Sequence, residues 1–177
     1  MVSARRFLQR SRRRRVTGSK PVSRNATHKR KGSGAAMLFG RKTRVLRRIL
    51  IVEDEPLIAF DTEHFLRDHD FEIVGTVDRV GSAVALLGES LLDLILSDIN
   101  LSDGSGVDVA RAAFDRGVPV LFVSGQCPLE ARQLAVGCLA KPYPQRDLLQ
   151  AIDAVEALQA GRPLRRLPNG LSLYDPV

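Results

Sequence analysis

Residues 94–98 read Leu-Ile-Leu-Ser-Asp, an apolar run that ends in a polar pair. A second run of the same kind, Ile-Leu-Ile-Val-Glu-Asp, occupies residues 49–54. Neither run alternates between apolar and polar residues, which is typical of strands buried on both faces of a parallel sheet. The two runs therefore indicate an α/β domain in which acidic residues follow buried strands.

From residue 48 onward, short apolar runs alternate with helical patterns. This alternation predicts an α/β fold, a doubly wound five-stranded parallel sheet with helices on both faces. Strands are predicted at residues 49–52, 71–77, 92–96, 118–123 and 136–140. Helices are predicted at residues 57–66, 80–87, 105–116, 131–135 and 145–159, and Gly117 is expected to end the third of them.

The charge of the chain is divided unevenly at about residue 48. Residues 1–48 hold seventeen Lys and Arg and no acidic residue, whereas the remainder holds the other ten basic residues and all twenty acidic ones. The net charge of +7 therefore averages a basic extension and an acidic globular part. We expect three regions: the extension at 1–47, the domain at 48–160, and a tail at 161–177 that is too short for an output domain.

The basic extension has several possible meanings. Residues 1–36 lack apolar periodicity, so we expect them to be disordered. Their charge suits nucleic acid or an anionic membrane surface. Arg5-Arg6-Phe7-Leu8 is a weak match to a twin-arginine signal, and the composition resembles a transit peptide, but no apolar segment follows. Translation from Met37 would remove most of the extension.

Two classes of protein are excluded by composition. No stretch approaches the roughly eighteen apolar residues of a membrane span, so an integral membrane protein is not expected. Two cysteines, Cys127 and Cys138, predict neither a disulfide scaffold nor a zinc ribbon. They indicate a reducing compartment, and we expect a cytoplasmic protein in which Cys138 is a small buried residue and not a redox sensor.

Polar side chains follow four of the five predicted strands. They are Glu53 and Asp54 after the first strand, Asp98 after the third, Ser124 after the fourth and Lys141 after the fifth. Each is ordinary alone, since an acidic pair after a strand is commonly a turn or a helix cap. Because the carboxyl ends of parallel strands meet at one edge of a sheet, we expect all five to lie together. Three carboxylates there would repel one another without a cation, and Mg²⁺ suits oxygen ligands.

The chain at this point resembles the receiver domain of two-component response regulators, over about residues 48–160. The similar segments are Arg48 to Pro56, Leu94 to Gly106, Val123-Ser124-Gly125 and Lys141-Pro142-Tyr143. The resemblance implies a flavodoxin-like strand order 2-1-3-4-5. It also implies a signalling protein and not an enzyme.

The resemblance assigns a role to each polar residue. Asp98 would accept a phosphoryl group from a phosphohistidine, forming an aspartyl phosphate. Mg²⁺ would be held by Asp54 directly, by Glu53 through water, by Asp98, and by the backbone carbonyl of Asn100.

Two further residues would assist the transfer. Lys141 would pair with Asp98 and contact the phosphoryl oxygens, and Ser124 would donate its hydroxyl to them. The Lys141–Pro142 peptide bond is expected to be cis, as the resemblance implies.

Two positions depart from the family's pattern. Ser102 stands where the family generally has Pro, and Cys138 stands where it has the aromatic residue that moves on activation. The resemblance thus implies an intact phosphoacceptor whose usual route of signalling outward is altered.

The partners implied are a histidine kinase or a histidine phosphotransferase, and an unidentified downstream protein. With a short tail, we expect a stand-alone receiver that signals by protein contact around the fourth and fifth strands, or that drains phosphoryl groups from a kinase. One alternative is a receiver-switched protein that binds nucleic acid through its basic extension. Another is an aspartate-nucleophile phosphatase, which would need a second acid where Asn100 stands.

Overall fold

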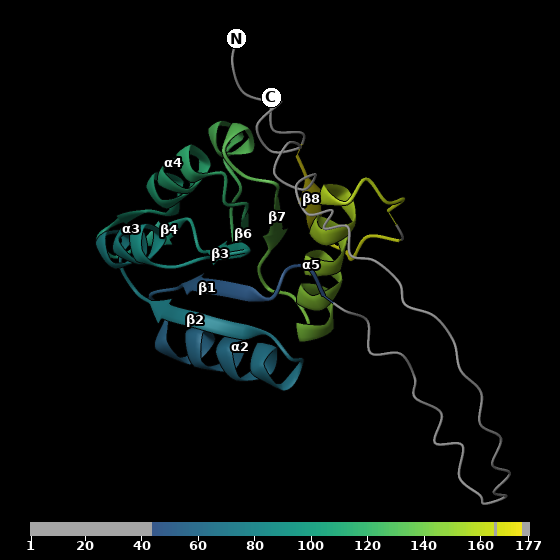
Figure 1. Ribbon diagram of the computed structural model, residues 1–177, viewed down its shortest axis with the longest axis horizontal. Helices are drawn as coiled ribbons and strands as arrows, with labels where there is room; N and C mark the ends of the chain where they lie inside the picture. The colour runs from purple at the N-terminus through teal and green to yellow at the C-terminus, as the bar shows by residue number, and fades with distance from the viewer. Residues whose placement is uncertain (1–43, 165, 175–177) are drawn as a thin grey trace, which may run out of the picture.

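The computed structural model describes residues 44–164 and 166–174 (Figure 1). The predictions made for residues 1–43, including the basic extension and the second start at Met37, lie outside the described residues. No helix within the described part is long and apolar enough to cross a membrane.

A mostly parallel sheet forms the centre of the domain, in the order β2-β1-β3-β6-β7-β8 (Figure 1). The first five of these strands run parallel to their neighbours, and β8 pairs antiparallel with β7. The strands are β1 (Arg48–Val52), β2 (Glu72–Val77), β3 (Leu94–Ser97), β6 (Val120–Ser124), β7 (Gly137–Ala140) and β8 (Leu171–Leu173). A separate two-stranded hairpin pairs β4 (Asn100–Leu101) with β5 (Gly104–Ser105).

Helices cover both faces of the sheet. They are α2 (Pro56–Asp68), α3 (Val80–Glu89), α4 (Gly106–Arg116), the 3₁₀ helix η2 (Leu129–Gln133) and α5 (Gln145–Gln159). Ser105 caps α4 by accepting a hydrogen bond from the N–H of Val107, and Gly117 ends it in the left-handed conformation at φ 69°. The α/β fold class and the predicted stop at Gly117 are confirmed.

Three details differ from the sequence-based expectation. The sheet has six strands and not five, because Leu171–Leu173 pairs with the free edge of β7. The helix expected at residues 131–135 is a 3₁₀ helix that begins two residues earlier. The two-residue strands β4 and β5 are too short to leave a periodic signal.

The inner strands β1, β3 and β6 are buried on both faces, which explains their uninterrupted apolar runs. Side chains of β1 alternate between two cores: Leu50 and Val52 pack on the α3 and α4 side, whereas Ile49 and Ile51 pack on the α2 and α5 side. The five residues of β6 are all buried. At about 25 cal/mol per Å² of apolar surface, this two-sided burial is the main stabilising contribution to the fold.

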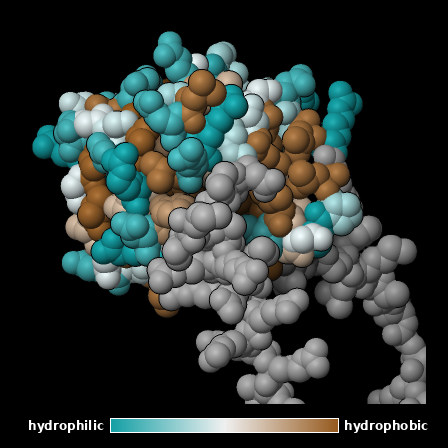
Figure 2. Space-filling model, turned by 90° about the horizontal axis from the view of Figure 1, so that it is seen from above, coloured by the Kyte–Doolittle hydropathy of each residue, from teal (hydrophilic) through white to brown (hydrophobic). Residues whose placement is uncertain are grey.

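The surface is mixed in character. Figure 2 shows hydrophobic side chains exposed among hydrophilic ones on the face that it draws. The most exposed large hydrophobic residues include Leu57 (80%), Leu91 (74%) and Leu129 (73%).

Asp93, in the loop before β3, anchors the start of β1. Its Oδ2 accepts hydrogen bonds from the backbone N–H groups of Arg47 (3.1 Å) and Arg48 (2.9 Å), and its Oδ1 accepts one from Nη2 of Arg48 (3.0 Å). Burial alone would raise the pKa of Asp93, but these hydrogen bonds outweigh it and hold the pKa below its usual value. The carboxylate therefore stabilises the folded state in its charged form.

We expect Asp93→Asn to lower the free energy of unfolding by about 1–2 kcal/mol at pH 7, since charge-assisted hydrogen bonds are lost. Because folding lowers the pKa of Asp93, the stabilisation is present above the unfolded-state pKa and is lost as the pH falls through the folded-state value. Measured by urea unfolding, the difference in free energy of unfolding between Asp93→Asn and the wild type should be constant above about pH 5 and shrink below about pH 4.

Asp78→Asn is the matched control, because the pair that Asp78 forms with Arg79 at 3.9 Å is exposed. Its effect should stay within about 0.5 kcal/mol at each pH. If Asp93→Asn lowered the free energy of unfolding by the same amount at pH 3.5 as at pH 7, the stabilising role of the Asp93 charge would be contradicted.

Candidate functional site

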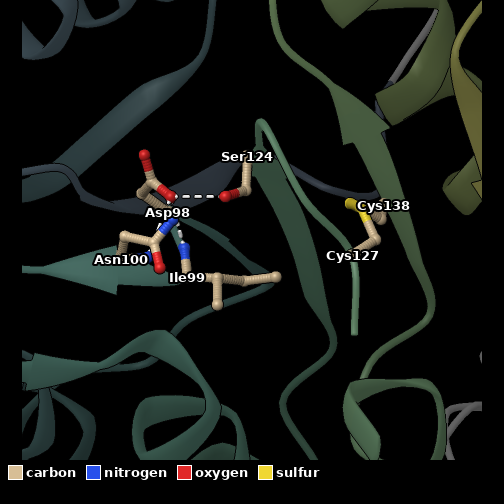
Figure 3. The surroundings of a disulfide bond; sticks show 6 residues. All are labelled: Asp98, Ile99, Asn100, Ser124, Cys127 and Cys138. Atoms are coloured by element: carbon tan, nitrogen blue, oxygen red, sulfur yellow. Dashed lines mark hydrogen bonds between the residues drawn. A yellow bond between two sulfur atoms is a disulfide. The ribbon is translucent and has the colours of Figure 1, made fainter. Parts of the chain in front are cut away.

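Asp98 directly follows β3, a strand flanked on both sides by others, and its side chain is nearly buried. Its Oδ1 accepts three hydrogen bonds (Figure 3): from the N–H of Ile99 at 2.5 Å, the N–H of Asn100 at 3.1 Å and the hydroxyl of Ser124 at 2.7 Å. The two N–H groups point at the carboxylate because the chain turns after β3 into the β4–β5 hairpin. Ser124 is the last residue of β6, so two strand ends meet here.

Lys141 brings together two more strand ends. Its Nζ lies 2.7 Å from Oε2 of Glu53, which follows β1, and 2.7 Å from Oδ2 of Asp98. The peptide bond from Lys141 to Pro142 is cis, as the resemblance implied. The structure thus gathers Glu53, Asp98, Ser124 and Lys141 at one edge of the sheet, as the strand ends predicted.

The ionised forms of Asp98 and Lys141 are favoured. Burial alone would raise the pKa of Asp98, but hydrogen bonds from Lys141, Ser124 and Asn100 outweigh it and hold the pKa below its usual value. Burial would likewise lower the pKa of Lys141, but its bonds to Asp98 and Glu53 outweigh this and raise the pKa. The pair is therefore a carboxylate and an ammonium at neutral pH.

Glu53 differs from Asp98 in its electrostatics. Burial raises the pKa of Glu53, and the hydrogen bond from Lys141 offsets this only in part. The nearby charge of Asp98 adds to the rise. A second cation beside Glu53 would favour its charged form.

Three carboxylates form a group that can hold a metal ion. Oxygen atoms of Glu53, Glu55 and Asp98 all lie within 4.8 Å of one another. Hard oxygen donors of this kind fit Mg²⁺.

Glu55 was not singled out by the sequence analysis, although the run of three acids at 53–55 was a signal for it. Asp54, which was singled out, is half-buried and is not one of the three. Asn100 contributes its N–H to Asp98, and its side chain is exposed.

Gly106, the first residue of α4, lies against the backbone of Asp98. A Cβ on Gly106 would be 1.9 Å from the carbonyl oxygen of Asp98 and 2.8 Å from Oγ of Ser97. Its N–H donates to the carbonyl of Ile99 at 2.8 Å. Only glycine permits α4 to begin this close to the residue that carries the carboxylate.

The cysteines require a correction. Cys127 and Cys138 form a disulfide, with Cα atoms 6.4 Å apart, which the sequence analysis did not predict. Their spacing gave no signal, because they meet only when the connection after β6 returns to β7. The expectation that Cys138 is buried is confirmed, since it is 0% exposed.

Comparison with known proteins agrees with this geometry. The family described as response regulator receiver domain matches residues 49–153. The chain belongs to this family. This match confirms the family that the sequence resemblance indicated. Receiver domains act in phosphorelay signalling, in which a kinase supplies the phosphoryl group.

Two individual relatives match this chain over only part of their own length. The transcriptional regulatory protein PdtaR of Mycobacterium tuberculosis is 35% identical over 115 residues, which cover 62% of this chain and 56% of PdtaR. The chain therefore spans little more than half the length of that relative. The phyllosphere-induced regulator PhyR of Methylorubrum extorquens is 40% identical over 79 residues, 43% of this chain and 30% of PhyR.

Solved structures support the fold. A CheY-like receiver domain protein from Methanospirillum hungatei superposes with a TM-score of 0.59 at 29% identity, covering 66% of this chain and 98% of that one. The receiver domain of a diguanylate cyclase from Desulfovibrio desulfuricans gives a TM-score of 0.58 at 26% identity, covering 65% and 97%.

We expect Gly106→Ala to lower the free energy of unfolding by ~1–3 kcal/mol, because the added methyl group forces the Asp98 backbone to move. The measurement is urea unfolding followed by circular dichroism. Gly81→Ala in α3 is the control, since a Cβ there meets nothing within 4 Å. It should leave stability unchanged or raise it by about 0.5–1 kcal/mol. Equal stability of the two variants would contradict the close contact at Gly106.

Proposed function

We propose that this protein is a receiver in which Asp98 accepts a phosphoryl group from a histidine kinase or a histidine phosphotransferase. The single observation that carries the proposal is the bonding of Asp98. Its Oδ1 accepts three hydrogen bonds, whereas Oδ2 contacts Nζ of Lys141. The carboxylate is fixed in position and ionised, as a nucleophile requires.

The chemistry follows from these contacts. A lone pair of Asp98 Oδ2 attacks phosphorus, the new O–P bond forms as the P–N bond of the phosphohistidine breaks, and the imidazole nitrogen keeps the electron pair. Lys141 lies beside Oδ2, where its charge stabilises the phosphoryl oxygens. Ser124 has a hydroxyl within reach of the same oxygens, so it would shift its hydrogen bond from the carboxylate to the phosphoryl group.

Mg²⁺ supplies charge neutralisation on the transferring phosphoryl group when it is bound. We assign Asp54, Asp98 and the backbone carbonyl of Asn100 as its direct ligands, with Glu53 acting through water. The close approach of the Glu53, Glu55 and Asp98 carboxylates supports a cation at this edge of the sheet.

An exposed apolar surface beside the site suits a protein donor. Leu57 and Phe60, near the start of α2, are 80% and 66% exposed, and α2 begins directly after the acidic run at 53–55. Exposed apolar side chains in a group are typical of protein contacts. We assign this surface to the phosphoryl donor, and the surface around β6 and β7 to the downstream protein.

The nucleophile is tested by Asp98→Asn. Incubated with acetyl phosphate and Mg²⁺, the wild type should gain one phosphoryl group by intact mass, and the variant should gain none, because an amide is not nucleophilic. Asp103→Asn is the matched control: Asp103 lies in the turn between β4 and β5, shortly after Asp98, and accepts a hydrogen bond from the N–H of Val80. It should be phosphorylated like the wild type, and full phosphorylation of Asp98→Asn would refute the assignment.

The metal ligands are tested by three amide variants. In a Mg²⁺ titration followed by amide NMR shifts, Asp54→Asn should weaken binding at least about tenfold, a loss of ~1.4 kcal/mol. Glu53→Gln should weaken it less, since water transmits its contact, and Glu55→Gln less again. A larger loss from Glu55→Gln than from Asp54→Asn would move the direct ligand to Glu55.

A further inference from the structure

The connection from β6 to β7 has little regular structure. Residues 125–136 link two parallel strands, and η2 is their only helical segment. Parallel strands are usually joined through a full α-helix that packs on the sheet. Here Ala131 and Ala135 are buried, whereas Leu129 is 73% exposed.

The disulfide ties this connection to the sheet. Cys138 lies within β7, paired in register with Phe122 of β6 on one side and with Ser172 of β8 on the other. It is therefore fixed and fully buried. Cys127 lies in the connection and is half-buried, so the covalent bond fastens a weakly structured segment to a rigid strand.

The fastened segment begins next to the phosphoacceptor. Ser124 donates its hydroxyl to Asp98, and only Gly125 and Gln126 separate it from Cys127. Figure 3 shows Ser124 between Asp98 and the cysteine pair. Holding Cys127 therefore restricts the path of the chain directly after Ser124.

The other end of the connection is held by noncovalent contacts. Arg132 of η2 lies over the ring of Tyr174, 5.5 Å from its centroid, and the N–H of Tyr174 donates to the carbonyl of Val136 at 3.0 Å. Breaking the disulfide would thus release the Ser124 end of the connection while its far end stays packed.

We propose that Cys127 and Cys138 are a reversible thiol–disulfide pair, and that its redox state sets the mobility of residues 125–130 and hence the lifetime of a phosphoryl group on Asp98. The second half of this inference rests on the proposed function; the first half does not. Since Cys127 is half-buried and Cys138 is fully buried, a reductant reaches the pair through the sulfur of Cys127.

The reductant is a dithiol, either small or on a protein. Its thiolate attacks Sγ of Cys127, the S–S bond breaks, and Sγ of Cys138 leaves and takes a proton. The second thiol of the reductant then attacks its own sulfur in the mixed disulfide and releases Cys127 as a thiol. Two electrons and two protons pass to the protein, and the reductant becomes a disulfide; the reverse exchange reoxidises the pair.

The pair fits regulation better than structural support. The domain has apolar cores on both faces of its sheet, so its fold does not depend on a covalent link. Cys127 and Cys138 are 11 residues apart in the sequence, so the disulfide closes a short loop that holds most of the connection from β6 to β7, beside Ser124. Its effect is therefore local.

The experiment compares oxidised and reduced full-length protein. Mixtures of oxidised and reduced dithiothreitol set the redox state, and trapping with N-ethylmaleimide followed by intact mass reports the number of free thiols. Hydrogen exchange then measures the amides of residues 125–130, and acetyl phosphate labelling measures the phosphoryl lifetime. We expect a single two-thiol transition, exchange about tenfold faster in the reduced protein, and unchanged exchange in β1 and β3.

Cys127→Ser and Cys138→Ala are the matched variants, the first at the half-buried position and the second an apolar replacement in the core. Both should exchange like the reduced protein whatever the dithiothreitol mixture. Two free thiols under oxidising conditions, equal exchange in both redox states, or a redox response that persists in Cys127→Ser would each overturn the inference.

The phosphoryl lifetime separates this inference from the proposed function. We expect it to differ about threefold or more between the redox states, since Ser124 directly precedes the released segment. An identical lifetime in both states would overturn the link to Asp98. Failure to phosphorylate Asp98 in either state would instead refute the proposed function, and hydrogen exchange would still decide whether the pair acts on the connection.

Discussion

The ion pairs of Lys141 with Glu53 and Asp98 are the constraint on which this site depends. Both carboxylates are less than a tenth exposed, and a buried charge without a partner is strongly unfavourable. Lys141 meets each of them at 2.7 Å, although it is 88 positions from Glu53 and 43 from Asp98 in the sequence. The site therefore exists only when the ends of β1, β3 and β7 are all in place. Among the described residues, every buried polar side-chain atom has a hydrogen-bond partner.

The parallel sheet makes this convergence possible. Because β1, β3 and β6 are buried on both faces, their apolar runs continue almost to the strand ends, and the polar side chains that follow emerge together at one edge. The turn after β3 then directs two N–H groups at Asp98, and Gly106 lets α4 begin directly behind it. Rigid strands thus hold the carboxylate, while the connection beside Ser124 has little regular structure. The least regular connection of the sheet therefore begins next to Asp98.

The C-terminal segment shows how pairing can override a weak local signal. Residues 171–173 were expected to belong to a short tail, but they form β8 and cover the edge of β7 that a five-stranded sheet would leave open. An exposed strand edge carries unpaired N–H and C=O groups, so its coverage is favourable. Tyr174, directly after β8, is then buried beside the β6–β7 connection. The same pairing places Cys138 between β6 and β8.

The sequence by itself determined the α/β fold, the parallel strands and four of the side chains at the site, because apolar runs and the residues that end them are local patterns. Asp98 and Lys141 were found in this way, without any knowledge of their distance. Only the tertiary structure decided which acids approach one another, that Glu55 joins Glu53 and Asp98, that residues 171–173 form a strand, and that Cys127 meets Cys138. These features depend on contacts between segments that carry no periodic signal of their own, since a three-residue strand or a cysteine in an irregular connection acquires its role from the neighbour that the fold provides.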